Sequence, residues 1–111
     1  MNSLNTEKKG RCPLCKSDSS FKIVNTIFEE QEDHYLEICD NCGKYIIGGI
    51  KRDTIDQYMP YLKRFSKLTK ETNLKGKRLI INIISLPDLI SENNNIDDII
   101  KKYPDYFVKD N

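Results

Sequence analysis

Cys12-Pro13-Leu14-Cys15 and Cys39-Asp40-Asn41-Cys42-Gly43 are the two stretches that decide the fold of this chain. They contain all four cysteines, each pair is spaced C-x-x-C, and 23 residues separate the pairs. Two such pairs supply four thiolates that can surround one Zn²⁺ tetrahedrally. Because four protein ligands leave no open coordination position, the pattern predicts one structural zinc ion held by Cys12, Cys15, Cys39 and Cys42.

Two other uses of the cysteines stay open at this point. A rubredoxin-like iron site takes the same four ligands, although the first pair lacks the glycine that usually follows there. Disulfides are the second alternative. Residues 1–9 are polar and lack the apolar segment of a signal peptide, so we expect a cytoplasmic chain with reduced thiols. Zinc is therefore the preferred interpretation.

The length and composition indicate one small globular unit. The chain has 111 residues, of which 38% are apolar and 32% charged. Such a chain has a modest core, so metal binding is expected to supply much of its folding free energy. The longest apolar run, residues 79–84, is far too short to span a bilayer, and no membrane partner is expected.

The segment around the cysteines has the composition of short strands. Residues 21–28, 34–38 and 44–47 are rich in β-branched and aromatic side chains, and Gly48 and Gly49 end the third run. The predicted fold is a small α+β zinc ribbon, an antiparallel hairpin plus a third strand on a zinc ion bound by four cysteines, with a helical C-terminal extension. The expected domains are a flexible lead-in (1–10), the ribbon (11–50) and the extension with one short strand (51–111).

Periodicity and caps predict the elements of the extension. The expected elements are a short helix over residues 53–58, a helix over 60–74 that ends at Gly76, a strand over 79–84 and helical turns over 87–93. Asn95 is expected to cap a last helix whose apolar face runs from Ile96 to Phe107, with Pro104 ending or bending it. In the helix over 60–74, Tyr61, Leu62, Phe65 and Leu68 are expected on one face, and Lys63, Lys67 and Lys70 on the opposite face.

The middle of the chain is basic. Residues 51–78 hold nine Lys/Arg and three Asp/Glu, whereas the whole chain has a net charge of +1 and a pI near 7.6. Nucleic-acid proteins usually have a pI above about 9, and lysines opposite an apolar helix face are usually just solvated. A nucleic-acid-binding ribbon is therefore the alternative function, with the candidate contacts Lys63, Arg64, Lys67, Lys70, Lys75, Lys77 and Arg78.

A protein-interaction or assembly subunit is the preferred function. The isoleucine-rich C-terminal third either packs on the ribbon or forms an interface with a protein partner. We expect no catalysis and no small-molecule substrate, because the chain has one histidine, no Ser/His/Asp arrangement and no Gly-rich phosphate loop. The lone His34 is expected to have a surface or cross-strand role and not to be a fifth metal ligand.

The pattern C-P-x-C followed by C-x-x-C-G-x-Y-x-I-x-G, present here from Cys12 to Gly49, resembles a bacterial and phage zinc-ribbon module. The helix that follows, and the segment 77–84 before Leu86-Pro87-Asp88-Leu89, are similar to that module as well. Such ribbons often precede effector or sensor domains, some in phage-defence systems. The resemblance therefore implies a small subunit of a bacterial defence or mobile-element system that acts on a separate partner.

Overall fold

The computed structural model describes residues 7–24, 34–48, 58–82 and 84–109. Within them lie the strands β1 (Lys8–Arg11), β2 (Asp18–Val24), β3 (His34–Cys39), β4 (Gly43–Gly48), β5 (Lys77–Ile81) and β6 (Phe107–Lys109). The helices are α1 (Leu62–Leu74), α2 (Leu86–Ser91) and α3 (Ile96–Lys102), with the short 3-10 helix η3 (Pro104–Tyr106). The chain is therefore a small α+β protein.

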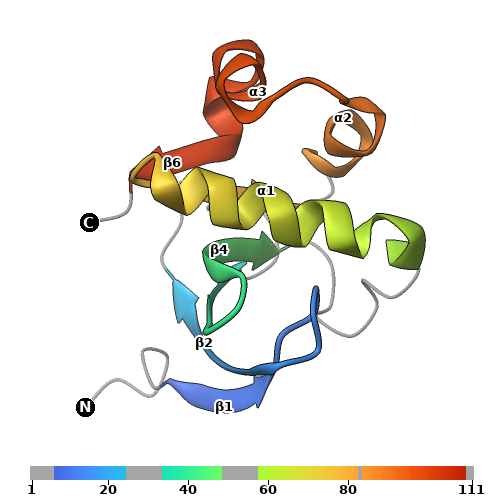
Figure 1. Ribbon diagram of the computed structural model, residues 1–111. Coiled ribbons are helices and arrows are strands. Elements are labelled where there is room, and N and C mark those ends of the chain that lie inside the picture. The colour runs from blue at the N-terminus through green and yellow to red at the C-terminus, as the bar shows by residue number, and fades with distance from the viewer. Residues whose placement is uncertain (1–6, 25–33, 49–57, 83, 110–111) are drawn as a thin grey trace.

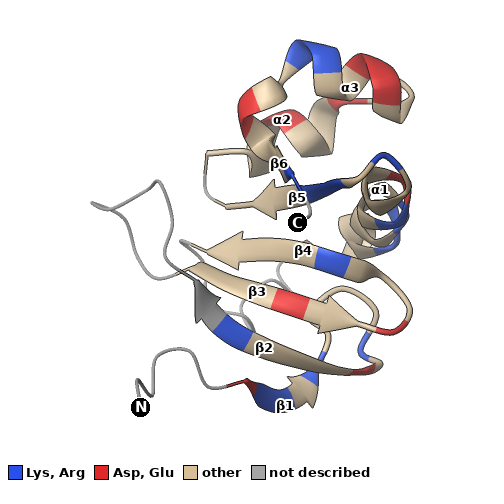
Figure 2. Ribbon diagram, turned by 90° about the vertical axis from the view of Figure 1, so that its left-hand side faces the viewer, with Lys and Arg blue, Asp and Glu red and all other residues tan. Residues whose placement is uncertain are grey.

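The six strands form one mixed sheet in the order β1-β2-β3-β4-β5-β6 (Figure 2). Strands β1 to β4 pair antiparallel with their neighbours, so they form a meander. Strand β5 pairs parallel with β4, because α1 lies between them in the chain and returns it to the same edge of the meander. Strand β6 then adds antiparallel to β5. One continuous sheet thus joins the predicted ribbon to the predicted extension.

Helix α1 lies across one face of the sheet, and α2 and α3 sit beyond it on the β6 side (Figure 1). Leu62, Phe65 and Leu68 are buried, because their spacing of three residues places them on one face of α1. The chain leaves α1 at Gly76, whose φ of +72° suits glycine. The predicted helix and its end are confirmed, except that residues 58–61 form a 3-10 turn before α1. The predicted apolar face is confirmed for Leu62, Phe65 and Leu68 but not for Tyr61, which is exposed.

The two faces of the sheet carry separate apolar clusters, because side chains alternate along a strand. On the α1 side, Tyr45 and Ile47 of β4 join Leu79 and Ile81 of β5 in the main core. On the other side a smaller cluster contains Leu36, Ile46 and Ile80. The main core continues to the buried side chains of α2 and α3, namely Leu86, Leu89, Ile96 and Ile99.

The strands and helices depart from the predictions at several places. The strand expected over residues 79–84 is β5, which begins at Lys77 and ends at Ile81. Residues 8–11 form β1, although this segment overlaps the lead-in expected over residues 1–10. The predicted end at Pro104 is confirmed, because α3 ends at Lys102 and Pro104 begins η3. The expectation that the helical face includes Phe107 is wrong, because Phe107 enters β6 instead. The cap at Asn95 is confirmed, since its Oδ1 accepts a hydrogen bond of 3.0 Å from the Asp98 N–H.

Other predictions fall partly outside the described residues. The helix expected over residues 53–58 lies outside the described residues except for Tyr58. The strand expected over residues 21–28 is described only as far as Val24. None of the helices in the described part of the chain combines the length and apolarity needed to cross a membrane.

Candidate metal centre

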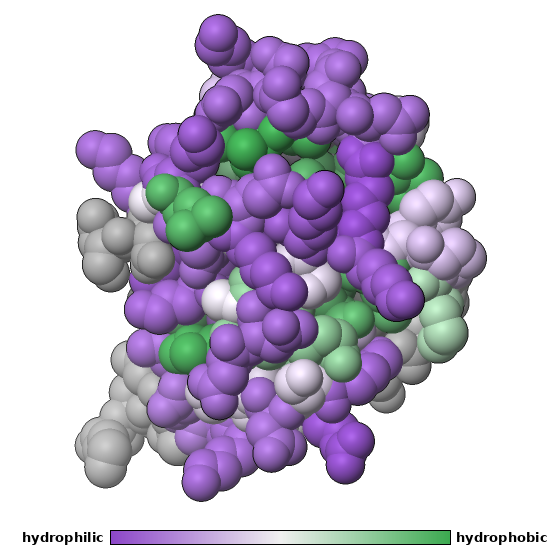
Figure 3. Space-filling view, viewed as in Figure 1, coloured by the Kyte–Doolittle hydropathy of each residue, from purple (hydrophilic) through white to green (hydrophobic). Residues whose placement is uncertain are grey.

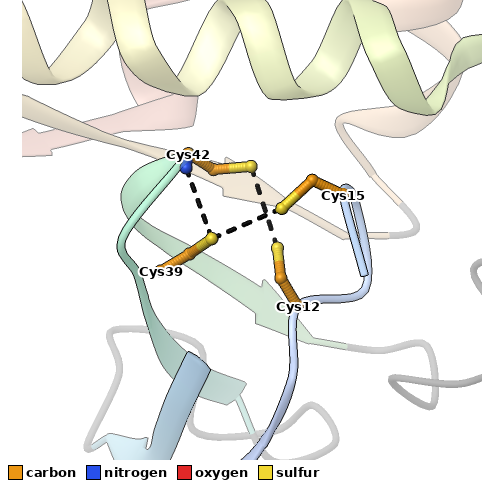
Figure 4. Close-up of side chains that lie close together, drawn as sticks. All are labelled: Cys12, Cys15, Cys39 and Cys42. Carbon is orange, nitrogen blue, oxygen red and sulfur yellow. Dashed lines mark hydrogen bonds between the residues drawn. The ribbon is translucent and has the colours of Figure 1, made fainter. Parts of the chain in front are cut away.

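The four cysteines converge on one point at the end of the sheet. Their sulfur atoms all lie within 4.8 Å of one another, and the four side chains point toward a common centre (Figure 4). The Sγ atoms of Cys12 and Cys42 are 3.8 Å apart, and those of Cys15 and Cys39 are 3.4 Å apart. A Zn–S distance of about 2.3 Å in a tetrahedral site requires sulfurs roughly 3.8 Å apart. The donor set therefore fits one zinc ion.

The same distances argue against disulfides. All four cysteines are free thiols. A disulfide needs two sulfurs at about 2.05 Å, much closer than either pair here. The geometry does not separate zinc from iron, because both ions accept four thiolates in a tetrahedral arrangement. The four cysteines therefore form a single site in which a metal ion would have four protein ligands.

Two tight turns, here called the knuckles, bring the cysteines together. The first knuckle (residues 12–16) joins β1 to β2, and the second knuckle (residues 39–43) joins β3 to β4. In the first, the Lys16 N–H donates to the Cys12 carbonyl at 2.8 Å. In the second, the Cys42 N–H donates to the sulfur of Cys39 at 3.3 Å. The antiparallel pairing of β2 with β3 sets the two knuckles side by side.

Two buried hydroxyl groups contact the sulfurs from the core. The Tyr45 Oη lies 3.1 Å from the sulfur of Cys12, and the Ser66 Oγ lies 3.0 Å from that of Cys42. Burial raises the pKa of Tyr45 well above its ordinary value, so its phenol keeps its proton and is able to donate to a Cys12 thiolate. Such donors orient metal ligands and spread the negative charge of a thiolate.

Helix α1 also fastens the backbone of the second knuckle. The Thr69 hydroxyl donates to the Cys42 carbonyl at 3.0 Å. One turn further along, Asn73 accepts from the Lys44 N–H and donates to the Lys44 carbonyl, both at 2.8 Å. Ser66, Thr69 and Asn73 therefore form a polar row on α1 that fixes the position of the second knuckle.

The protonation of the thiols reflects how closely they are packed. The hydrogen bond with Cys42 lowers the pKa of Cys12 to about 4 and raises that of Cys42. Burial raises the pKa of Cys39 to about 11. Burial also acts against ionisation of Cys15, but hydrogen bonds from Ser17 and Asn41 outweigh it and lower the Cys15 pKa. Without a cation, the four sulfurs thus share protons, and a divalent ion would replace those protons.

The seven basic side chains predicted to contact nucleic acid have different surroundings. Lys63, Lys67 and Lys70 are exposed along α1 and border a hollow beside Cys15. The other four differ from these in their contacts or position. Arg64 Nη1 donates to the Asn93 Oδ1 at 3.1 Å, Lys75 pairs with Asp97 at 3.0 Å, and Lys77 and Arg78 are half-buried on β5.

His34 is buried, so the part of its prediction that placed it at the surface is wrong. It opposes Gly48 on the neighbouring strand, and a Cβ on Gly48 would meet the His34 ring at 2.3 Å. Its Nε2 lies 3.5 Å from the Asn82 Nδ2. The cross-strand role is therefore the one that the structure supports, and His34 is not among the clustered metal donors found in the described residues.

The residues that surround the sulfurs were not predicted from the sequence. Tyr45 belongs to the ribbon pattern, whereas Ser66, Thr69 and Asn73 belong to no motif in the sequence. One signal was available, because polar residues at positions 66, 69 and 73 repeat with helical spacing next to the apolar face of α1. Nothing in the sequence indicates that this row faces the second knuckle, since only the parallel return to β5 places it there.

No family model matches this chain, and no curated protein or solved structure is found to be similar to it. The resemblance to a bacterial or phage zinc-ribbon module therefore remains a prediction that depends on the cysteines and their immediate neighbours.

Proposed function

We propose that this chain is a non-catalytic binding module in which one zinc ion, held in a ribbon-like site by Cys12, Cys15, Cys39 and Cys42, stabilises the fold. The observation that carries the proposal is the convergence of four thiols from two knuckles. All four positions of a tetrahedral ion would be taken by protein sulfurs, which leaves none for a substrate or an activated water.

The position of the site supports a structural role for the metal. The first knuckle reaches the rest of the molecule at the sulfurs, at Leu14 and at the strands that it joins. The second knuckle is fastened to α1. A metal ion there links the β1–β2 turn, the β3–β4 turn and, through Ser66, the main helix. In a chain with so modest a core, this link is worth a large part of the folding free energy.

The packing of the isoleucines bears on the class of partner. The case for a protein-interaction or assembly subunit depended on the isoleucine-rich C-terminal third. Ile80, Ile81, Ile96 and Ile99 are buried in the molecule's own cores. The large apolar side chains that the described residues expose are Met59 and Tyr61 on the turn before α1, Leu74 at the end of α1, and Ile84 before α2. Figure 3 shows a largely hydrophilic surface on the α1 side.

A protein partner in a bacterial defence or mobile-element system therefore has only the sequence resemblance in its favour. Nucleic-acid binding, the second candidate function, is favoured by the exposed lysines of α1. Salt separates the two, because binding to phosphates weakens steeply as salt rises, whereas an apolar protein interface is much less sensitive.

The structural role of zinc is tested by metal content and unfolding. Purified protein should carry one zinc ion per chain, and Cys39→Ser should lose both the metal and the cooperative unfolding transition. The matched control is Asp40→Ser, an exposed neighbour in the same knuckle, which should retain both. Metal content is measured by atomic emission and unfolding by circular dichroism in urea. A metal-free chain that unfolds as cooperatively as the zinc form would overturn the proposal.

A further inference from the structure

A hollow lies between the two knuckles and α1. Its volume is about 420 Å³, within the usual range of roughly 300–1,000 Å³ for small-ligand sites. Its walls come from three segments of the chain: Cys15 of the first knuckle, Asn41 of the second, and Lys63, Ser66, Lys67 and Lys70 of α1. The side chains that line it carry positive charge or are neutral, except for the cysteine sulfur.

Three lysines of this hollow have no acidic partner among the residues that the structure describes. Lys75 and Lys102, which are exposed as well, pair with Asp97 at 3.0 Å and with Glu92 at 3.2 Å. Lys63, Lys67 and Lys70 form no such pair within the described ranges. Their spacing of four and three residues aligns them in one row on α1, about 10 Å long at 1.5 Å per residue.

The simplest role for this row is to offset the charge of the metal site. A zinc ion with four thiolates carries a net charge of −2, which three lysines exceed by one. Of the four sulfurs, only that of Cys15 borders the hollow. Those of Cys12 and Cys42 are buried and contact the hydroxyls of Tyr45 and Ser66. The row also extends along α1 over two helical turns. Its positive charge is therefore more than the metal site requires.

We propose that this hollow and the row formed by Lys63, Lys67 and Lys70 bind the phosphate backbone of a nucleic-acid strand. The lysines contact successive phosphates, and the Asn41 side chain, which lines the same hollow, is a neutral hydrogen-bonding group. Contacts of this kind position a strand and do not read its bases, so binding is independent of sequence. The proposal rests on the structural zinc site, because two of the three walls are the knuckles.

This site is narrower than the basic region of the sequence. Arg64, Lys75, Lys77 and Arg78 take no part in it, since they contact other segments or lie on β5. The proposal therefore separates the lysines of α1 from lysines elsewhere on the surface. That separation makes a charge-matched control available. Lys8, Lys101 and Lys109 are exposed, lie outside the hollow and can be changed together.

The experiment measures binding of the zinc-loaded full chain to a dye-labelled, mixed-sequence single strand of about ten nucleotides, by fluorescence anisotropy. The triple variant Lys63→Gln/Lys67→Gln/Lys70→Gln should bind at least about tenfold more weakly than the unchanged chain between about 50 and 200 mM salt. The slope of log affinity against log salt should fall by about 2, because each lost phosphate contact removes roughly 0.7. The control triple Lys8→Gln/Lys101→Gln/Lys109→Gln should keep the original slope.

Three results would overturn the proposal. The first is an unchanged chain that does not bind the strand, and the second is an equal loss of affinity in the two triple variants. The third is equally strong binding of polyglutamate of similar length, which would indicate a surface for acidic proteins instead. Zinc content and unfolding are measured on the same samples. If only the phosphate site fails, all variants keep zinc and fold, whereas failure of the structural zinc role shows as a folded metal-free chain.

Discussion

The two knuckles have the same cysteine spacing, but the residue that completes each turn differs. Lys16 follows the first pair with φ +65°, and Gly43 follows the second with φ +88°. The sequence suggested that the first knuckle departs from the usual pattern because it lacks this glycine. The structure shows that the backbone takes the left-handed conformation at both positions. The turn therefore requires the conformation, and glycine is one way to reach it.

The atoms around each left-handed residue explain why only the second knuckle needs a glycine. A Cβ on Gly43 would lie 2.5 Å from the Asn73 Oδ1, because α1 packs directly on the second knuckle. Lys16 is exposed, and its Nζ donates to the Pro13 carbonyl at 2.9 Å. Both knuckles reach the main core, the first through Cys12 and Leu14 and the second through Cys39 and Cys42. Helix α1 also holds the second knuckle by hydrogen bonds from Ser66 and Thr69, so the first knuckle depends more on the metal. Substitutions in the two knuckles test this difference.

The largest effect is expected from removing one ligand in each knuckle. Four ligands share a zinc-binding free energy of about 10–16 kcal/mol, or roughly 2.5–4 kcal/mol each. Cys15 is half-buried, so water can take its place in Cys15→Ser, and a weakened site should remain. Cys42 is fully buried, so Cys42→Ser should lose the metal and the fold. Zinc titration measures the metal affinity of each variant, and urea unfolding measures its stability. Equal losses in Cys15→Ser and Cys42→Ser would contradict the difference between the two knuckles.

A smaller effect is expected for Gly43→Ala. The alanine must adopt a left-handed φ and must also displace Asn73, so we expect a loss of about 2–4 kcal/mol in the free energy of unfolding. Gly76→Ala is the matched control. Its φ is +72°, and a Cβ there would meet no atom within 4 Å. It should lose only the conformational part, about 1–2 kcal/mol. Urea unfolding of the zinc-loaded variants gives both values. Equal losses would show that the contact with Asn73 costs nothing.

The smallest effect is expected for Lys16→Gly. Glycine relieves the left-handed strain, worth about 1–2 kcal/mol, but it makes the unfolded chain more flexible by about 0.5–1 kcal/mol. The hydrogen bond to the Pro13 carbonyl is lost as well. The free energy of unfolding, measured in urea on the zinc-loaded chain, should therefore stay the same or rise by up to about 1 kcal/mol. If the free energy of unfolding of Lys16→Gly falls instead, the lysine itself holds the first knuckle in place.

Local sequence signals identified much of the fold and the four candidate ligands. The spacing of the cysteines selected all four members of the sulfur cluster. Hydrophobic pattern and capping residues located β3, β4 and α1 to within two residues, and the start of α3 at Asn95. These features depend on residues close in sequence, such as a periodic apolar face, a turn or a cap, and short-range physical rules apply to them.

Features that depend on long-range pairing were decided by the tertiary structure alone. Strand β1 is a mostly exposed Lys-Lys-Gly-Arg segment, and β6 has only three residues, so neither has the sequence pattern of a strand. Both form because the neighbouring strand has free backbone N–H and C=O groups at its edge. The parallel pairing of β4 with β5 brings α1 over the second knuckle. That packing places Ser66 and Asn73 beside the second knuckle and the lysines beside the hollow. The sequence by itself determined which residues gather at the metal site, and the tertiary structure decided what surrounds it, because burial and contact across the sheet arise only when distant segments pack together.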